Sequence, residues 1–303
     1  MSVRLVFGIC VLAACSQGGD GSSGDGGSAD ARLIDAPIDA IPAETDLVPA
    51  VGGASTLELM TWNIRMFPST EQTPEILADL IASMDVDIVV FQEVDDARAF
   101  QRTDARLYGW ATALPSVPGG RTGSVGVAYR EGLVTLGEPE LLFLADGDFP
   151  RPPVVLPITV GGETFSLIVV HLKAGFDASD QAARVGASAT LEAEVRARVD
   201  GAGEDAIAVI GDWNTALSDS RADEVFAPWR DARYNFVTED LAEGGGVTFL
   251  PSDVELDHIV TTTAFDAIRG SAQPQIIPLD AQFGEYRTII SDHVPLVVKM
   301  PMP

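Results

Sequence analysis

Residues 207–214 read Ile-Ala-Val-Ile-Gly-Asp-Trp-Asn, an apolar run that ends in a glycine followed by polar side chains. Such a short apolar run predicts a buried strand, and the polar groups mark its end. Four other polar clusters adjoin apolar runs: Thr61-Trp62-Asn63, Phe91-Gln92-Glu93, Val170-His171-Leu172-Lys173 and Ser291-Asp292-His293. We therefore expect five strands to bring carboxylate, amide and imidazole groups to one spot. This set suits the binding of a hard divalent cation and the cleavage of a phosphate ester.

The remaining pattern predicts an α/β fold in which strands dominate. Strands are expected over 57–64, 87–91, 123–129, 133–144, 154–160, 164–170, 207–210, 256–260 and 294–298, with a hairpin turn at Gly161-Gly162. Helices are expected over 74–84, 95–105 and 180–199. Strands with helices inserted between some of them predict two packed sheets with helices on the outside, so that strand ends converge on one edge.

The N-terminus has the pattern of an export signal. Arg4 is followed by the apolar stretch 5–14, which is too short to span a bilayer as a helix. Leu12-Ala13-Ala14-Cys15 resembles a bacterial lipobox, which predicts a signal peptide over 1–15 and lipidation of Cys15. An ordinary signal peptide is the alternative. The only other cysteine, Cys10, would leave with the signal, so the mature chain could form no intramolecular disulfide.

Composition divides the rest of the chain into two parts. Residues 16–55 are rich in Gly, Ser, Asp, Ala and Pro and are expected to form a disordered tether. Residues 56–303 are expected to form one domain of roughly 245 residues. Of the formal charge of −26, the tether carries −6 and the signal +1, which leaves −21 on the domain. A surface this acidic disfavours tight non-specific binding to DNA, which normally needs a basic face.

Glu93 ends an apolar run, where a buried, unpartnered charge would be costly and a divalent cation would compensate it. Asn63, at the end of the neighbouring strand, is placed to hydrogen-bond Glu93 or a metal-bound water. Asp212 and Asn214 alternate around Trp213, so both would point to one side if the strand continues. There Asp212 can activate a water and Asn214 can donate to a phosphoryl oxygen. An Asx turn after Gly211 is the alternative.

Two of the three histidines, His171 and His293, adjoin apolar strands beside charged residues. Asp257 is a candidate partner that would hold His293 in one tautomer and stabilise its charged form. His258 alternates away from Asp257 and is interpreted as structural or peripheral. Zinc and serine-hydrolase chemistry are disfavoured because their motifs are missing, and the segment 119–123 lacks the Lys-Ser/Thr of a nucleotide-binding loop and is expected to be a hairpin loop.

Taken in order, these motifs and Leu256-Asp257-His258-Ile259 resemble the endonuclease/exonuclease/phosphatase superfamily over residues 56–300. The resemblance implies a four-layered α/β sandwich of two mostly antiparallel sheets flanked by helices. It implies Mg²⁺ as the cofactor, which Mn²⁺ or Ca²⁺ could replace, with Glu93 as the principal ligand and Asn63 and Asp292 beside it. It also implies that Asp212 orients or activates the attacking water next to Asn214. The remaining roles fall to His171 and the His293–Asp257 pair, which would stabilise the transition state.

Arg151 and Lys173 are expected to contact the substrate phosphate. Arg151 precedes a proline, as a phosphate-contacting arginine does in pancreatic-type deoxyribonucleases, which this part of the chain resembles. Two departures stand out. Trp213 replaces the phenylalanine common in its motif, and no residue between Glu93 and His171 matches the usual partner of the first histidine.

These observations predict an exported, lipid-anchored and monomeric Mg²⁺-dependent phosphodiesterase at the outer membrane or cell surface, with DNA favoured as the substrate. A sphingomyelinase-like or small-molecule phosphoesterase is the alternative that the acidic surface favours. A non-catalytic lipoprotein that binds at the cell surface is the alternative from another class.

Overall fold

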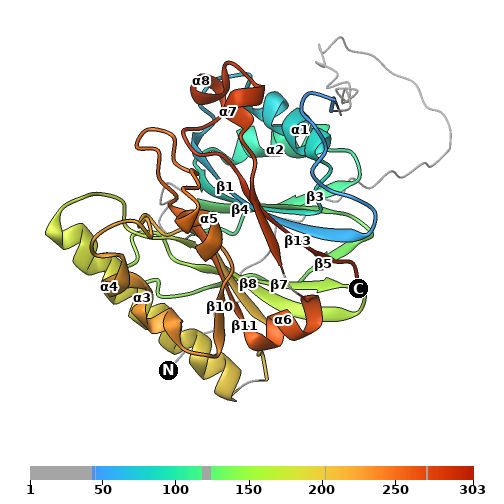
Figure 1. Cartoon of the computed structure of the whole chain (residues 1–303). Coiled ribbons are helices and arrows are strands. Elements are labelled where there is room, and N and C mark those ends of the chain that lie inside the picture. Colours follow the sequence, from blue (N-terminus) through green and yellow to red (C-terminus); the bar gives the residue numbers. More distant parts are fainter. Residues whose placement is uncertain (1–42, 45, 118–123, 202, 271) are drawn as a thin grey trace, which may run out of the picture.

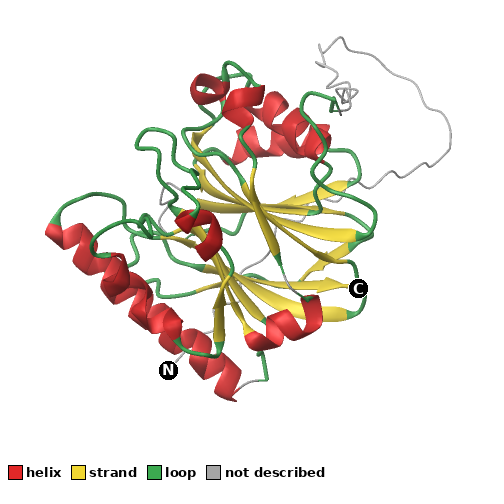
Figure 2. Ribbon diagram, viewed as in Figure 1, coloured by secondary structure: helices red, strands yellow, loops and turns green. Residues whose placement is uncertain are grey.

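Two β-sheets pack face to face and helices cover both outer faces, which gives four layers (Figures 1 and 2). The computed structural model describes residues 43–44, 46–117, 124–201, 203–270 and 272–303. The first sheet has the order β12-β13-β1-β2-β4-β3. Its strands are β1 (Thr56–Phe67), β2 (Ile88–Val94), β3 (Trp110–Ala113), β4 (Ser124–Arg130), β12 (Gln273–Ile276) and β13 (Leu296–Pro301).

The second sheet has the order β10-β11-β9-β8-β7-β5, and β6 also pairs with β7. Its strands are β5 (Val134–Leu136), β6 (Glu140–Leu141), β7 (Val154–Val160), β8 (Glu163–His171), β9 (Ile207–Asp212), β10 (Tyr234–Phe236) and β11 (Asp257–Thr262). β7 and β8 form the predicted hairpin, and both glycines of its turn, Gly161 and Gly162, have positive φ.

Each sheet contains one parallel pair in an otherwise antiparallel arrangement. β1 is parallel to β2, and β8 is parallel to β9. Each pair is joined by a helical crossover, α1 (Thr73–Met84) in the first sheet and α3 (Ala178–Gly201) in the second. The four parallel strands therefore end at one edge of the sandwich, and the antiparallel strand β11 begins there. We call this edge, to which the sequence predicts that the catalytic side chains converge, the catalytic edge. The predicted sandwich of mostly antiparallel sheets is confirmed.

Three apolar layers hold the sandwich together. One lies between the sheets, where Leu59, Val90, Val169 and Ile210 pack together. A second lies under the helices of the first sheet, which are α1, α2 (Ala97–Arg106), α7 (Leu279–Gln282) and α8 (Tyr286–Ile289). The third lies under α3, α4 (Ala222–Phe226) and the 3-10 helix η1 (Ala227–Arg230). Two short helices flank β11: α5 (Glu239–Glu243) connects β10 to β11, and α6 (Thr263–Arg269) connects β11 to β12 of the first sheet.

Most predicted elements are present within a few residues of their expected bounds, but two expectations are wrong. The expected strand 133–144 is broken into β5 and β6, because the pairing with β7 stops after Gly137, whose N–H still donates to the Pro157 carbonyl, and Pro139 has no N–H to donate. The folded body also begins before residue 56. Val48 is buried, and Leu47 and Val51 donate backbone hydrogen bonds to Ser83 Oγ and to the Met84 carbonyl at the end of α1.

Several expectations lie outside the described residues. These are the signal peptide with Cys15, the tether up to residue 42, and the loop at 119–123. Within the described ranges, no helix combines the length and the apolar character needed to cross a membrane.

Candidate active site

The polar side chains of the catalytic edge continue the inward-facing series of their strands. In β1 the series runs Leu59, Thr61, Asn63, and in β9 it runs Ala208, Ile210, Asp212, because alternate residues of a strand face the same side. His171 extends the inward series of β8 in the same way, and Asp257 begins that of β11. The site therefore lies between the two sheets, where the central apolar layer ends.

Asn63 links the two sheets across this edge. Its Nδ2 donates to Glu93 Oε1 at 3.1 Å and to Asp212 Oδ2 at 3.0 Å, while its Oδ1 accepts from the backbone N–H of Arg65 at 3.0 Å. The predicted hydrogen bond between Asn63 and Glu93 is thus confirmed. Because the Asn63 side chain is almost completely buried, these bonds fix both carboxylates relative to each other.

Glu93 reaches the site through an irregularity in β2. Strict alternation would turn its side chain away from the inward-facing Gln92, but Glu93 has a φ of 65° and lies where the β2–β4 register shifts. Its second oxygen, Oε2, accepts from the backbone N–H of Met66 at 2.8 Å. The carboxylate is therefore held on both oxygens and still keeps 19% of its side chain exposed at the mouth of the site.

His293 is held by its side chain and by its backbone. Its Nδ1 lies 2.8 Å from Asp257 Oδ2, which confirms the predicted pair, and its Nε2 lies 3.8 Å from Asp212 Oδ2. Its backbone N–H donates to Ser291 Oγ, which itself donates to the carbonyl of Asn63. Burial alone would lower the pKa of His293, but the charges of Asp257 and Asp212 raise it to about 9. The ring is therefore cationic at neutral pH.

The sequence did not predict a second hydrogen bond that holds the backbone of His293. The Tyr286 hydroxyl donates to the His293 carbonyl and accepts from Trp62 Nε1 at 2.9 Å. Tyr286 and Trp62 are 224 positions apart in the chain, so no local pattern marks their contact.

His171 has no single partner. Its Nε2 lies 3.5 Å from Asp212 Oδ2 and 3.7 Å from Glu93 Oε1. Its Nδ1 is buried and, among the described residues, has no hydrogen-bond partner. Burial and the nearby positive charges of Arg151 and His293 hold the pKa of His171 well below its usual value. The ring is therefore neutral, and the charge of Arg151 lies close enough to the site to affect it.

Asp212 ends β9, and the chain turns immediately after it. Asp212 Oδ1 accepts from the backbone N–H of Asn214 at 2.8 Å, and Asn214 has a φ of 50°. The strand therefore does not continue to Asn214, and the Asx turn is the arrangement that forms. The Asn214 amide donates to the carbonyl of Leu172 at 3.1 Å, which ties this turn to the end of β8. Burial raises the pKa of Asp212 to about 6 against the opposing charge of His293.

Two predicted site residues have other partners as well. Asp292 Oδ2 lies 3.6 Å from Arg65 Nε, and a quarter of its side chain is exposed. Lys173 Nζ lies 2.8 Å from Asp180 Oδ1 and donates to the Ala174 carbonyl, so a contact with phosphate would require this ion pair to open. His258 has the structural role expected. It is buried against Phe226 and Phe236, and its Nε2 lies 2.9 Å from the Thr215 carbonyl.

The oxygen donors at the mouth of the site fit a hard divalent cation. Glu93 and Asp292 supply partly exposed carboxylates, and Mg²⁺ commonly needs only one or two of these because it keeps several waters. Within the described ranges, no group of three or more His, Cys, Asp or Glu side chains is placed to hold a metal ion.

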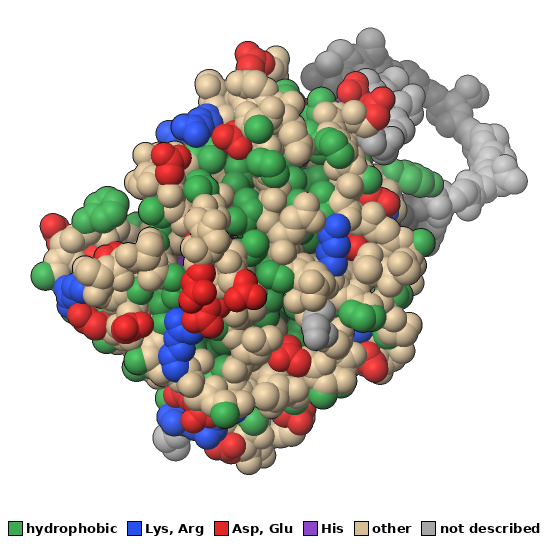
Figure 3. Space-filling model, in the orientation of Figure 1, with side chains coloured by type: hydrophobic (Ala, Val, Ile, Leu, Met, Phe, Trp, Pro, Cys, Tyr) green, Lys and Arg blue, Asp and Glu red, His purple; other side chains and the backbone are tan. Residues whose placement is uncertain are grey.

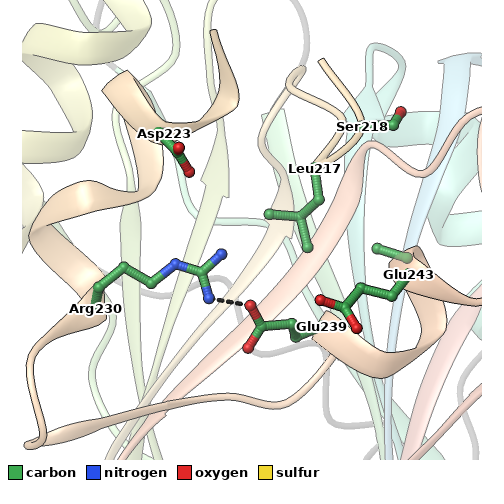
Figure 4. Close-up of a pocket in the computed structure, with 7 residues that line it drawn as sticks. Leu217, Ser218, Asp223, Arg230, Glu239 and Glu243 are labelled. Atoms are coloured by element: carbon green, nitrogen blue, oxygen red, sulfur yellow. Dashed lines mark hydrogen bonds and ion pairs between the residues drawn. The ribbon is translucent and has the colours of Figure 1, made fainter. Parts of the chain in front are cut away.

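A pocket of about 240 Å³ lies beyond the turn that follows β9, and the catalytic side chains do not line it (Figure 4). Arg230 and Glu239 form an ion pair on one side, and Leu217 points into the space beside them. Asp223 and Glu243 add two more carboxylates. The pocket is acidic, in keeping with the face in Figure 3, where basic side chains form only small, separate patches.

Comparisons with solved structures find the same fold in proteins of low sequence identity. The D. rerio TDP2 structure complexed with a single-strand DNA product is 18% identical, with a TM-score of 0.62 over 81% of this chain and 99% of that one. The human Nocturnin catalytic domain with bound sulfate is 17% identical, with a TM-score of 0.59 over 82% and 94%. A Bacteroides thetaiotaomicron mannosyl-6-phosphatase is 15% identical, with a TM-score of 0.57 over 80% and 99%.

A search of curated proteins finds no match. The model of the Endonuclease/Exonuclease/phosphatase family matches residues 60–293, which run from β1 to His293 and include every side chain of the catalytic edge described above. The chain therefore belongs to the endonuclease/exonuclease/phosphatase family, whose members hydrolyse phosphate esters.

Proposed function

We propose that this protein is an exported, lipid-anchored phosphodiesterase that depends on Mg²⁺ and acts on DNA in preference to other phosphoesters. The observation that carries the proposal is the meeting of Glu93, Asp212, His171 and the His293–Asp257 pair at one edge of the sandwich. The TDP2 structure with bound single-strand DNA product has the same fold and supports a nucleic-acid substrate.

The two protonation states at the site suit hydrolysis. Asp212, with a pKa of about 6, is ionised at neutral pH and basic enough to take a proton from an attacking water. Asn63 and the backbone of Asn214 hold its two oxygens, so the carboxylate cannot rotate away. His293 is cationic and can donate from Nε2 to a phosphoryl oxygen, while Asp257 fixes its orientation through Nδ1.

The remaining residues serve binding. Glu93, with Asp292 and Asn63 near it, would hold Mg²⁺, which would neutralise negative charge on the phosphoryl group. The charge of Arg151 acts on the neutral His171 ring, and both groups can contact the phosphate. Lipid attachment at Cys15 would keep the enzyme at the outer membrane or cell surface as a monomer on a tether. The support for this anchoring is the lipobox spelling of residues 12–15.

The acidic surface favours a second candidate, a phosphoesterase acting on sphingomyelin or on small molecules. A net charge of −21 on the domain repels a polyanion more than it repels a substrate with a single phosphate. The fold is also shared with a mannosyl-6-phosphatase of Bacteroides thetaiotaomicron, so the fold is compatible with a small phosphoester as the substrate.

A substrate panel tests the proposal. The chain from residue 43 is assayed with Mg²⁺ on plasmid DNA, sphingomyelin and a chromogenic phosphodiester, with and without EDTA. We expect DNA to be cleaved fastest and EDTA to abolish turnover. His293→Ala should lower turnover at least about 10²-fold, on the scale of one lost catalytic group. If the wild type turns over no substrate, the protein is a non-catalytic binding lipoprotein; if sphingomyelin is cleaved fastest, the second candidate replaces the first.

A further inference from the structure

Phe176 is an apolar side chain exposed to solvent on the loop between β8, which ends at His171, and α3. Of the described residues, the large apolar ones that are exposed are Met66, Tyr108 and Phe176, and Phe176 is exposed to 97%. It lies five residues after His171, so the chain allows it to be at most about 18 Å from that residue. Met66, 61% exposed, adjoins the site from the other sheet, since its backbone N–H binds Glu93.

The loop that carries Phe176 is fixed by buried polar contacts. Arg184 of α3 is almost completely buried, and its Nη1 donates to the carbonyls of Lys173 at 2.8 Å and Gly175 at 2.9 Å. Its Nη2 donates to Gln181 Oε1 at 2.9 Å. Gly175 has a φ of 117°, and a Cβ there would lie 2.1 Å from Asp180 Oδ2. The backbone before Phe176 is therefore held to α3, and α3 itself begins two residues after Phe176.

A fixed loop with an exposed ring is a preorganised contact surface. An exposed phenylalanine does not stabilise the fold. Because the loop is already ordered, less conformational entropy is lost when a ligand binds to it. A planar ring on this loop, at most about 18 Å from His171, can stack on a nucleobase of a bound strand, an interaction that is independent of base sequence. Stacking also suits this acidic surface, because it adds affinity without requiring a track of Lys and Arg along the phosphates.

We propose that Phe176 stacks against an unpaired base of the substrate strand, so that the enzyme selects single-stranded nucleic acid. The inference rests on the proposed function and narrows its substrate class. A duplex would not serve equally well, because its bases are already stacked on one another and turn only their edges outward.

The test compares two substrates that differ only in the bases. One is an oligothymidine, and the other is a strand of the same length built from abasic nucleotides. For Phe176→Ser we expect the KM for oligothymidine to rise about 5- to 150-fold, with kcat changed less than about 2-fold. The KM for the abasic strand should not change. Phe176→Trp should restore the wild-type KM, and Tyr108→Ser, at an equally exposed aromatic site outside the loop, should have no effect.

The outcomes distinguish a failure of the stacking proposal from a failure of the proposed function on which it rests. If the wild type cleaves both strands with a KM that does not depend on Phe176, or if Phe176→Ser raises both KM values equally, the stacking proposal is wrong and the nuclease proposal stands. If the wild type cleaves neither strand, both fail. Binding to phosphatidylcholine vesicles that is kept by Phe176→Leu and lost by Phe176→Ser would assign the ring to a lipid surface and overturn stacking.

Discussion

His293 Nδ1 lies 2.8 Å from Asp257 Oδ2, and this hydrogen bond joins the two sheets at the catalytic edge. His293 precedes β13 of the first sheet, whereas Asp257 begins β11 of the second. The bond from Asn63 to Asp212 crosses between the sheets in the same way. Each sheet thus supplies one partner of each contact, so the packing of the sheets sets the geometry of the candidate site. A substitution that shifts either sheet should therefore alter the geometry of the site through these two hydrogen bonds.

Asp257→Asn should lower kcat by about 10² to 10⁴-fold while the protein stays folded, because the carboxylate fixes the tautomer of His293 and stabilises its charge. It should also lower the pKa of His293 from about 9. Activity that needs the cationic ring is lost as the pH rises through this pKa, so the variant should lose its residual activity at lower pH than the wild type. Rate profiles from pH 6 to 10 would measure this. Asp253→Asn, at an exposed acid of the same segment, is the control.

Glu93→Gln should weaken Mg²⁺ binding, because it removes the charge that would hold the cation while the amide can still accept the bond from Met66. A cation at one hundred times its dissociation constant stabilises a protein by about 2.7 kcal/mol. We expect Mg²⁺ to raise the melting temperature of the wild type and to have little effect on the variant. Thermal unfolding with and without Mg²⁺ needs no substrate. If Mg²⁺ raises the melting temperature of both proteins equally, Glu93 is not a ligand of the cation.

The sequence predicts the site residues better than it predicts their orientation. Asn63, His171 and Asp212 could be identified because they end long apolar runs, and alternation alone turns them inward. Glu93 breaks the alternation through a bulge with a positive φ, a conformation that depends on the register with β4. The sequence favoured a strand that continues to Asn214, with an Asx turn as the alternative, and the fold adopts the turn.

Two further features depend on contacts between distant parts of the chain. The Trp62–Tyr286 bond could not be predicted, since neither residue lies in a recognisable motif with the other. The segment 46–55 was assigned to the tether because its composition is poor in large apolar residues. It packs nevertheless, because α1 offers Ser83 Oγ and its last carbonyl as acceptors for backbone groups that composition does not reveal.

Glu255 should make the protein less stable at alkaline pH. It is buried, neither carboxylate oxygen has a hydrogen-bond partner among the described residues, and burial together with the charge of Asp257 raises its pKa to about 8. Because the folded-state pKa exceeds the unfolded value of 4.5, its stabilising effect is complete below pH 4.5 and is lost as the pH rises through 8.

Glu255→Gln imitates the neutral acid, so wild type and variant should be about equally stable near pH 5. Near pH 8.5 the variant should be more stable by about 3 to 5 kcal/mol, from the pKa shift at 1.36 kcal/mol per unit. Urea unfolding at both pH values measures the difference. Glu71→Gln, at an exposed glutamate, should show no such dependence. A difference between wild type and Glu255→Gln that stays the same at both pH values would mean that Glu255 is already ionised in the folded protein at pH 5.

Gly211→Ala should disrupt the site and the fold together. Gly211 has a φ of 142°, and a Cβ there would lie 2.1 Å from the carbonyl oxygen of Val170 in the paired strand β8. The clash would push apart the strand ends that carry His171 and Asp212. We expect a loss of about 2 to 4 kcal/mol in unfolding free energy, comparable to other steric conflicts in a core. Gly147→Ala, where a Cβ would meet nothing within 4 Å, is the control.

Removing residues 43–55 should destabilise the domain without affecting its chemistry. Val48 is 4% exposed and packs in the layer under α1, and the Glu44 N–H donates to Asp79 Oδ1 at 2.9 Å. Burying one valine contributes about 1.5 to 3 kcal/mol, so a chain that begins at residue 56 should unfold several degrees below one that begins at residue 43. Val48→Ser in the longer chain should reproduce most of the loss. Because none of these contacts reaches the catalytic edge, kcat for both shortened and substituted chains should match the wild type at 25 °C. Equal melting temperatures for the two chain lengths would mean that residues 43–55 belong to the tether and do not stabilise the domain.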